Sequence, residues 1–87
     1  MKFEYKGKGS KLIRLEIEWK NDKINRINIY GDFFLHPEES IFDLEKELIN
    51  KDKNEIKEIL NNFFKKVEYA GIDPDTLYDA IISSLVK

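Results

Sequence analysis

Apolar and charged residues alternate strictly along residues 13–20, and this alternation restricts the fold more than any other feature of the chain. The odd positions are apolar: Ile13, Leu15, Ile17 and Trp19. The even positions from 14 onward are charged: Arg14, Glu16, Glu18 and Lys20. Successive side chains of a β-strand point to opposite faces of the sheet. The period of two therefore predicts a strand with one buried face and one solvated face.

Two neighbouring segments share this alternation. A short opening strand carries Phe3 and Tyr5 on one face, and Asn21-Asp22-Lys23 predicts a tight turn after the long strand. A third strand then continues the apolar face through Ile27, Ile29, Gly31 and Phe33. The first third of the chain is therefore predicted to form a three-stranded antiparallel β-meander.

The rest of the chain has helical spacing. Pro37-Glu38-Glu39 suits the start of a first helix, because proline fits the first position and acids complement the helix dipole. Apolar stripes at helical spacing follow in residues 41–49, 56–67 and 77–85. Asp52 and Asp73-Pro74-Asp75 predict the starts of two further helices, and Gly71 ends the second. The predicted class is α+β, with three helices packed on one face of the sheet.

Composition excludes several kinds of site. Eighty-seven residues, 41% of them hydrophobic, are enough for one domain spanning residues 1–87 with a modest core. Without cysteine the chain has no disulfide, thiolate metal site or cysteine nucleophile, and the single histidine, His36, is expected to cap a helix or lie on the surface. No catalytic residues and no metal site are predicted. The chain has no apolar run of ~18 residues and no signal peptide, so we expect a soluble cytoplasmic protein.

Charge is spread unevenly along the chain, whose net charge is −2. Residues 1–29 contain eight Lys/Arg and four Asp/Glu, a net charge of +4, whereas residues 30–87 contain seven Lys/Arg and thirteen Asp/Glu, a net charge of −6. Two solvated faces would explain this split; alternatively, the basic segment faces an anionic ligand or partner. Nucleic-acid binding is not expected, because the net charge is negative and Trp19 belongs to the buried face.

A glycine-rich turn, Gly7-Lys8-Gly9-Ser10-Lys11, lies between the first two predicted strands. It lacks the spacing of a phosphate-binding loop, and no helix follows it to present amides to a phosphate. Two interpretations remain open. Either the glycines supply the backbone angles of a tight turn, or Lys8 and Lys11 contact an anionic group at the edge of the sheet.

The segment from Tyr30 to Phe34 joins the last predicted strand to the first helix. Gly31 permits a close backbone approach, and Asp32 can accept hydrogen bonds from local amides. The alternation places Phe33 on the buried face, where its truncation to alanine would cost about 3–5 kcal/mol, and Phe34 on the opposite face. In one interpretation both phenylalanines lie in the core. In the other, an exposed Phe34 or Tyr30 anchors a partner.

At these residues the chain resembles the C-terminal accessory domain of lipoate–protein ligases, including the stand-alone form that is a separate small subunit in some archaea. The resemblance covers about residues 5–85. It rests on Gly9-Ser10-Lys11, Ile29-Tyr30-Gly31-Asp32-Phe33-Phe34, Pro37-Glu38-Glu39, Leu44-Glu45, Leu48 and Gly71. The chain departs from the family pattern at Ser10, where the family usually has glycine, and at Ile49-Asn50, which replaces a glycine. Asn50 would then cap the first helix in the left-handed conformation.

The resemblance implies the fold of the iron–sulfur assembly scaffold, without its cysteines, and a non-catalytic accessory role. In such ligases a catalytic domain binds lipoate, ATP and Mg²⁺, forms lipoyl-AMP and transfers the lipoyl group to a lysine of an acceptor domain. This chain would bind none of these cofactors alone. It would form a heterodimer with a catalytic domain on a separate chain, support lipoyl-AMP formation, and meet lipoyl-acceptor domains only indirectly.

The resemblance also implies roles for particular residues. Lys8 and Lys11 would lie near the reacting phosphates and neutralise part of their charge. Partner-binding or signature residues would come from the junction: Tyr30, Gly31, Asp32 and Phe34. The alternative function is a protein-interaction adaptor of the same fold that is unrelated to lipoylation. A small enzyme or a nucleic-acid binder is the least favoured function.

Overall fold

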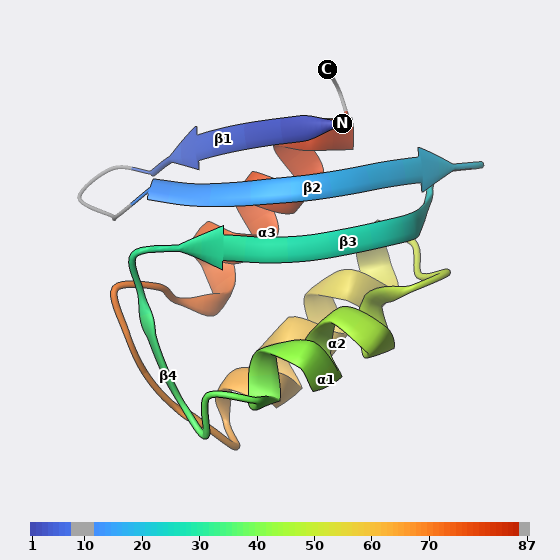
Figure 1. Cartoon of the computed structure of the whole chain (residues 1–87). Helices are drawn as coiled ribbons and strands as arrows, with labels where there is room; N and C mark the ends of the chain where they lie inside the picture. The colour runs from blue at the N-terminus through green and yellow to red at the C-terminus, as the bar shows by residue number, and fades with distance from the viewer. Residues whose placement is uncertain (8–11, 86–87) are drawn as a thin grey trace.

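The first three strands form the antiparallel meander that the alternation predicts (Figure 1). The structure, a computed structural model, describes residues 1–7 and 12–85. Strands β1 (Lys2–Lys6), β2 (Leu12–Lys20) and β3 (Lys23–Gly31) lie in the order β1-β2-β3. The apolar positions of β2 are buried: Ile13, Leu15 and Ile17 are each at most 1% exposed. The buried face and the solvated face are therefore those predicted.

A two-residue turn and a bulge fix the register between β2 and β3. Asn21 (φ 54°) and Asp22 (φ 61°) both adopt the left-handed conformation, as in hairpin turns whose twist matches that of the strands. The pairing register shifts between Glu18 and Trp19. Because of this shift Ile24 is buried on the same face as Ile27, although the two are three positions apart. A strict alternation would not assign Ile24 to the core.

Three helices cover one face of this sheet (Figure 1): α1 (Ser40–Leu48), α2 (Lys53–Phe64) and α3 (Pro74–Leu85). Each contributes fully buried side chains to a common core: Leu44 and Leu48, Ile56 and Leu60, Leu77 and Ile81. This is the predicted α+β architecture. Within residues 1–7 and 12–85, no helix has the length and apolar character needed to span a bilayer.

The helix ends carry the caps predicted from the sequence. The Asp52 carboxylate accepts hydrogen bonds from the amides of Asn54 and Glu55, both at 3.0 Å. The Asp52 amide in turn donates to the Glu55 carboxylate at 3.1 Å, which completes a capping box at the start of α2. Asp73 accepts from the Thr76 amide at 2.7 Å at the start of α3. Asn50, after α1, has a φ of 65°, so its predicted left-handed conformation is confirmed.

α1 begins three residues later than predicted. The carbonyl oxygen of Pro37 accepts hydrogen bonds from the Ser40 amide (3.1 Å) and from the Ser40 hydroxyl (2.6 Å), and these bonds close a turn before the helix. Glu38 and Glu39 lie in this turn and not in the first helical turn. The predicted start at Pro37 is wrong because a serine hydroxyl that bonds a nearby carbonyl oxygen favours a turn over an earlier start of the helix.

Two short strands were not predicted. β4 (Phe34–His36) and β5 (Glu68–Ala70) pair antiparallel as a separate two-stranded sheet. The prediction that α2 reaches Val67 is wrong, because the helix ends at Phe64 and the chain turns into β5. A three-residue strand is too short to show a period of two, and so neither strand has a sequence signal of its own.

Candidate functional site

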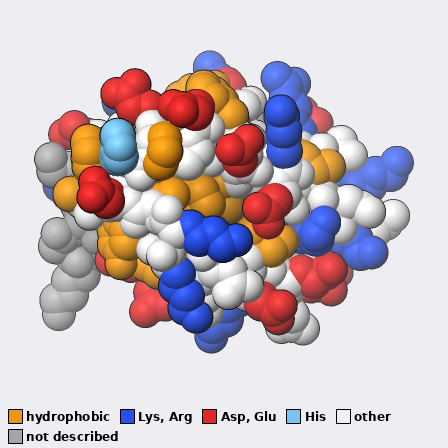
Figure 2. Space-filling model, turned by 90° about the horizontal axis from the view of Figure 1, so that it is seen from below, with side chains coloured by type: hydrophobic (Ala, Val, Ile, Leu, Met, Phe, Trp, Pro, Cys, Tyr) orange, Lys and Arg blue, Asp and Glu red, His pale blue; other side chains and the backbone are white. Residues whose placement is uncertain are grey.

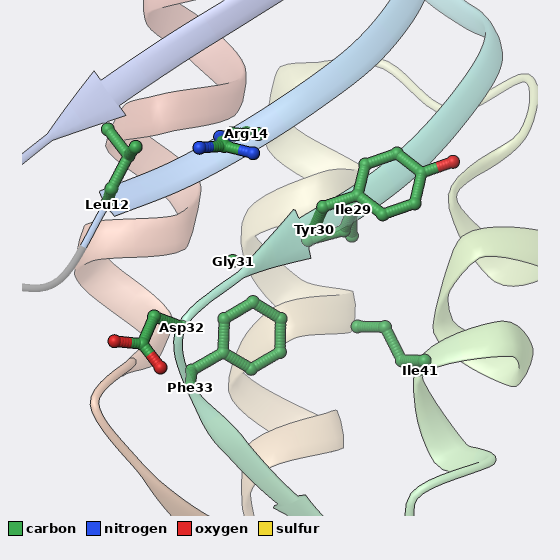
Figure 3. A pocket seen from close by; sticks show the side chains of 8 residues that line it. All are labelled: Leu12, Arg14, Ile29, Tyr30, Gly31, Asp32, Phe33 and Ile41. Carbon is green, nitrogen blue, oxygen red and sulfur yellow. The ribbon is translucent and has the colours of Figure 1, made fainter.

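The end of β3 and the segment after it line an open depression of about 550 Å³ (Figure 3). The residues that wall it come from β2, β3, the junction and α1: Leu12, Arg14, Ile29, Tyr30, Gly31, Asp32, Phe33 and Ile41. A smaller depression of about 230 Å³ shares Phe33 and Ile41 with the first and is also lined by Phe34, Leu35 and Glu38. We call the two depressions together the junction groove.

The junction groove brings together the four junction residues that the sequence singled out. Tyr30, Gly31 and Asp32 line the larger depression, and Phe34 lines the smaller one. Lys8 and Lys11, the other two predicted site residues, lie outside the described residues. Their proximity to an anionic group therefore stays a prediction.

Leu35, and not either phenylalanine, is the buried residue of the junction. Leu35 is 5% exposed, Phe34 is 52% exposed, and Phe33 is partly buried at the margin of the core. The prediction that Phe33 is a full core residue is thus wrong, while Phe34 is exposed, as one of the two interpretations required. The physical reason is that Phe34 begins β4, whose own alternation buries Leu35 and exposes its neighbours.

Gly31 permits the close approach that the sequence suggested. A Cβ atom at this position would lie 2.7 Å from the carbonyl oxygen of Leu12 and 2.9 Å from the ring of Phe33. Both distances are below normal van der Waals contact. The missing side chain of Gly31 therefore allows the Phe33 ring to lie against the end of β3, where it faces Ile41 across the groove (Figure 3).

Tyr30 stands on the rim of the groove with 50% of its surface exposed. Its hydroxyl donates to the Glu16 carboxylate on β2 at 3.4 Å. On the same face of the sheet the Arg14 guanidinium lies 3.4 Å from the Glu4 carboxylate on β1. Partial desolvation and the negative charge of Glu16 raise the pKa of Tyr30 above its usual value of 10.0, so the phenol is neutral at physiological pH.

Phe34 and His36 lie on the same face of β4. Their rings are nearly parallel, with centroids 6.5 Å apart and an angle of 8° between the ring planes. His36 is exposed, in agreement with its prediction as a surface residue, and it does not cap α1. The His36 ring instead stacks on the Phe34 ring.

Glu45 connects α1 to this region through a hydrogen bond that the sequence did not predict. Its carboxylate accepts a hydrogen bond from the Ile29 amide at 2.7 Å, and so α1 is bound to the outer edge of β3. Glu45 follows Ile41 by four residues, which places both on the side of α1 that faces β3. The available sequence signal was the position of Glu45 at the margin of the apolar stripe of α1. This stripe does not show which group on β3 the carboxylate contacts.

Acidic residues are frequent in the segment that forms most of the junction groove, and two of them, Asp32 and Glu38, line it. Residues 31–45 contain neither lysine nor arginine, and their acids number five: Asp32, Glu38, Glu39, Asp43 and Glu45. Figure 2 shows acidic side chains beside the hydrophobic side chains that gather around the single histidine. In the part of the chain that the structure describes, no three acidic or histidine side chains are placed to hold a metal ion. The groove thus offers apolar contact area with acidic side chains at Asp32 and Glu38, and its cation Arg14 lies 3.4 Å from the Glu4 carboxylate.

Comparisons with known proteins agree with each other. The profile of the family described as "Bacterial lipoate protein ligase C-terminus" matches residues 4–81. Lipoate-protein ligase A subunit 2 of Thermoplasma acidophilum is 34% identical over 71 residues, which cover 80% of this chain and 76% of that protein. A chain from the structure of an archaeal lipoylation system, a bi-partite lipoate protein ligase and its E2 lipoyl domain from Thermoplasma acidophilum, superposes with a TM-score of 0.79 at 32% identity. The superposition covers 92% of this chain and 91% of that chain.

Proposed function

We propose that this chain is the non-catalytic accessory subunit of a two-chain lipoate–protein ligase. The proposal proceeds from its family, because the chain belongs to the lipoate–protein ligase C-terminal domains. In this proposal it docks on a separate catalytic chain as a heterodimer and supports ATP-dependent formation of lipoyl-AMP in the cytoplasm. The catalytic chain holds ATP, Mg²⁺ and lipoate. Lipoyl-acceptor domains meet the assembled ligase and contact this chain only indirectly.

The observation that carries this proposal is the extent of the structural likeness. It runs over nearly the whole of both chains, and its counterpart comes from a ligase described as bi-partite. A likeness of this extent, at 32% identity, supports a shared role as well as a shared fold. It motivates a catalytic partner on a separate chain.

The chemistry of the junction groove supports a role in binding more than a role in catalysis. Tyr30 has a raised pKa and is neutral near pH 7, which makes it a poor base. The charge of Arg14 is partly balanced by Glu4. Half-exposed aromatic side chains, by contrast, are the residues that contribute most to the stability of protein interfaces.

Lys8 and Lys11 have a separate role in this proposal. Their ammonium groups lie near the phosphates of ATP or the adenylate and neutralise charge as it develops during adenylation. Lys11→Ala should then slow lipoyl-AMP formation and leave the complex intact, as measured by adenylation rate and by co-elution. Loss of the complex would instead make this turn an interface element.

Reconstitution tests the proposed function. The purified chain is mixed with a separately expressed catalytic chain, and ATP- and lipoate-dependent lipoyl-AMP formation is measured with and without it. A faster reaction in its presence is the expected result, whereas equal rates would contradict the proposal. Affinity capture that recovers a different stable partner and no ligase would favour the adaptor function.

A further inference from the structure

We propose that the junction groove is the docking surface for the catalytic chain, and that the segment it receives carries an apolar side chain flanked by lysine or arginine. This inference rests on the proposed function. It adds the location of the interface on this chain and the chemistry of the partner segment.

The groove has an apolar floor between two aromatic rims. Phe33 and Ile41 line both depressions and face each other across the larger one (Figure 3). Tyr30 and Phe34 stand on the rims and are 50% and 52% exposed. An apolar side chain seated between them would remove much of this aromatic surface from water. Buried aromatic anchors of this kind dominate the free energy of many interfaces.

Three of the side chains that line the groove already have contacts within this chain. The Phe33 ring lies against the backbone at Gly31, the Phe34 ring stacks on His36, and the Tyr30 hydroxyl is bonded to a carboxylate on the next strand. Side chains that are already ordered lose less conformational entropy on association. The groove is therefore a pre-organised surface.

The charge around the groove selects the chemistry of the partner. Glu38 lines the smaller depression, and the segment from residue 31 to residue 45 carries five acids with no lysine or arginine. A partner with acidic residues at the contact would meet like charge, which costs affinity, whereas lysine or arginine beside an apolar anchor would be attracted. Arg14 also lines the larger depression, but its charge is partly balanced by Glu4, so the side of the groove with Asp32 and Glu38 favours a cationic segment.

A second copy of this chain fits the groove less well. Eight of its fifteen cations lie in residues 1–29, and on the outer face of the sheet the Arg14 guanidinium is already near Glu4. A contact between this sheet face on one copy and the groove on the next would also be head-to-tail. Repeated head-to-tail contacts form an open filament unless the rotation between copies closes them into a ring. A separate catalytic chain can bind the groove once without forming a ring or a filament.

Two matched pairs of variants test the assignment, with binding to the purified catalytic chain measured by calorimetry. Phe34→Ala removes an aromatic rim of the groove, and Phe42→Ala removes a phenylalanine that is 61% exposed and does not line either depression. Glu38→Lys reverses a charge in the groove. Glu58→Lys makes the same change on the exposed side of α2.

We expect Phe34→Ala to raise the Kd by about tenfold or more and Phe42→Ala to change it by less than about twofold. Glu38→Lys should weaken binding at low salt and reduce its salt dependence, and Glu58→Lys should do so much less. Thermal unfolding shows whether each variant is folded. Because Glu38 is exposed in a turn, Glu38→Lys provides the test even where Phe34→Ala fails to fold.

The possible failures are distinguishable. Binding at wild-type affinity by both Phe34→Ala and Glu38→Lys, while the wild type still supports adenylation, would overturn the groove assignment and leave the proposed function intact. If the wild-type chain does not bind the catalytic chain, both proposals fall. Self-association of the wild type that Phe34→Ala abolishes would assign the groove to a second copy and overturn the docking proposal.

Discussion

Gly31 is the residue of the junction with the least freedom to change. A Cβ atom there would meet the carbonyl oxygen of Leu12 on one side and the ring of Phe33 on the other. The ring can shift, but the carbonyl belongs to the backbone of β2, whose register is fixed by pairing with β3. The constraint on residue 31 is therefore steric.

Gly31→Ala should therefore lower the free energy of unfolding by about 1–3 kcal/mol, the usual cost of an added methyl group in a packed site. Urea unfolding measures it. In a Phe33→Ala background the cost should fall without vanishing, because the clash with Leu12 remains. An unchanged stability in both backgrounds would contradict the close packing at this position.

Leu35 and Phe33 provide a second test at the residue scale. Leu35 is buried, so Leu35→Ala should cost about 2–5 kcal/mol. Phe33 is only partly buried, and Phe33→Ala should cost about 1–2 kcal/mol because less of its surface leaves water on folding. Both values come from chemical denaturation. A larger loss for Phe33→Ala than for Leu35→Ala would mean that the burial described here is wrong.

Among the elements, α1 and its C-terminal loop protect the outer edge of β3. The Ile29 amide donates to Glu45, the Ile24 amide donates to the Lys51 carbonyl at 3.2 Å, and the Asn50 amide donates to the Ile24 carbonyl at 2.6 Å. These bonds occupy backbone groups that an exposed edge strand would offer to other chains. The helix thus covers both the face and the edge of the sheet.

Glu45→Ala should destabilise the protein by about 1–2 kcal/mol, since it removes a charge-assisted hydrogen bond and leaves the Ile29 amide without its acceptor. The Ile29 amide should also exchange with deuterium faster, as measured by NMR. Glu45→Gln keeps an acceptor and should recover most of the protection. Equal exchange in the wild type and Glu45→Ala would contradict the role of α1 at this edge.

Trp19 reports on the contact between β2 and α3. Its indole nitrogen donates to the Ser84 hydroxyl at 3.0 Å, and that hydroxyl donates to the Ile81 carbonyl at 2.5 Å. Ser84→Ala should cost about 1 kcal/mol and change the emission of this single tryptophan. Ser83→Ala, the neighbouring change, serves as the control. Identical emission and stability for both variants would rule out the contact.

Elements with a strong local signal were predictable from the sequence, and those that depend on tertiary pairing were not. The strand at residues 12–20 was identified by its period of two, and the starts of α2 and α3 by the acids at Asp52 and Asp73. β4 and β5 were missed because three residues have no measurable period. The exposed Phe34 was one of two interpretations, and only the turn of the chain into β4 decides between them.

At the scale of the whole molecule, the split in charge does not produce one uniformly basic face among residues 1–7 and 12–85. On the outer face of the sheet Arg14 lies beside Glu4, and the hydroxyl of Tyr30 is bonded to Glu16, so cations and anions are interleaved there. Five of the thirteen acidic residues of the second half lie instead in residues 31–45, and two of these, Asp32 and Glu38, line the junction groove. Charges of one sign therefore predominate near the junction groove more than on the outer face of the sheet. The groove also has exposed aromatic surface, and for both reasons we assign the partner to the groove.

The proposed function, support of lipoyl-AMP formation by a non-catalytic chain, is tested most directly by titration. A fixed amount of catalytic chain receives increasing amounts of this chain, and the initial rate of lipoyl-AMP formation is recorded with ATP and lipoate in excess. We predict a rate that rises and saturates at one accessory chain per catalytic chain, with no lipoyl-AMP formed by the accessory chain alone. A rate that does not depend on the added chain would contradict this function.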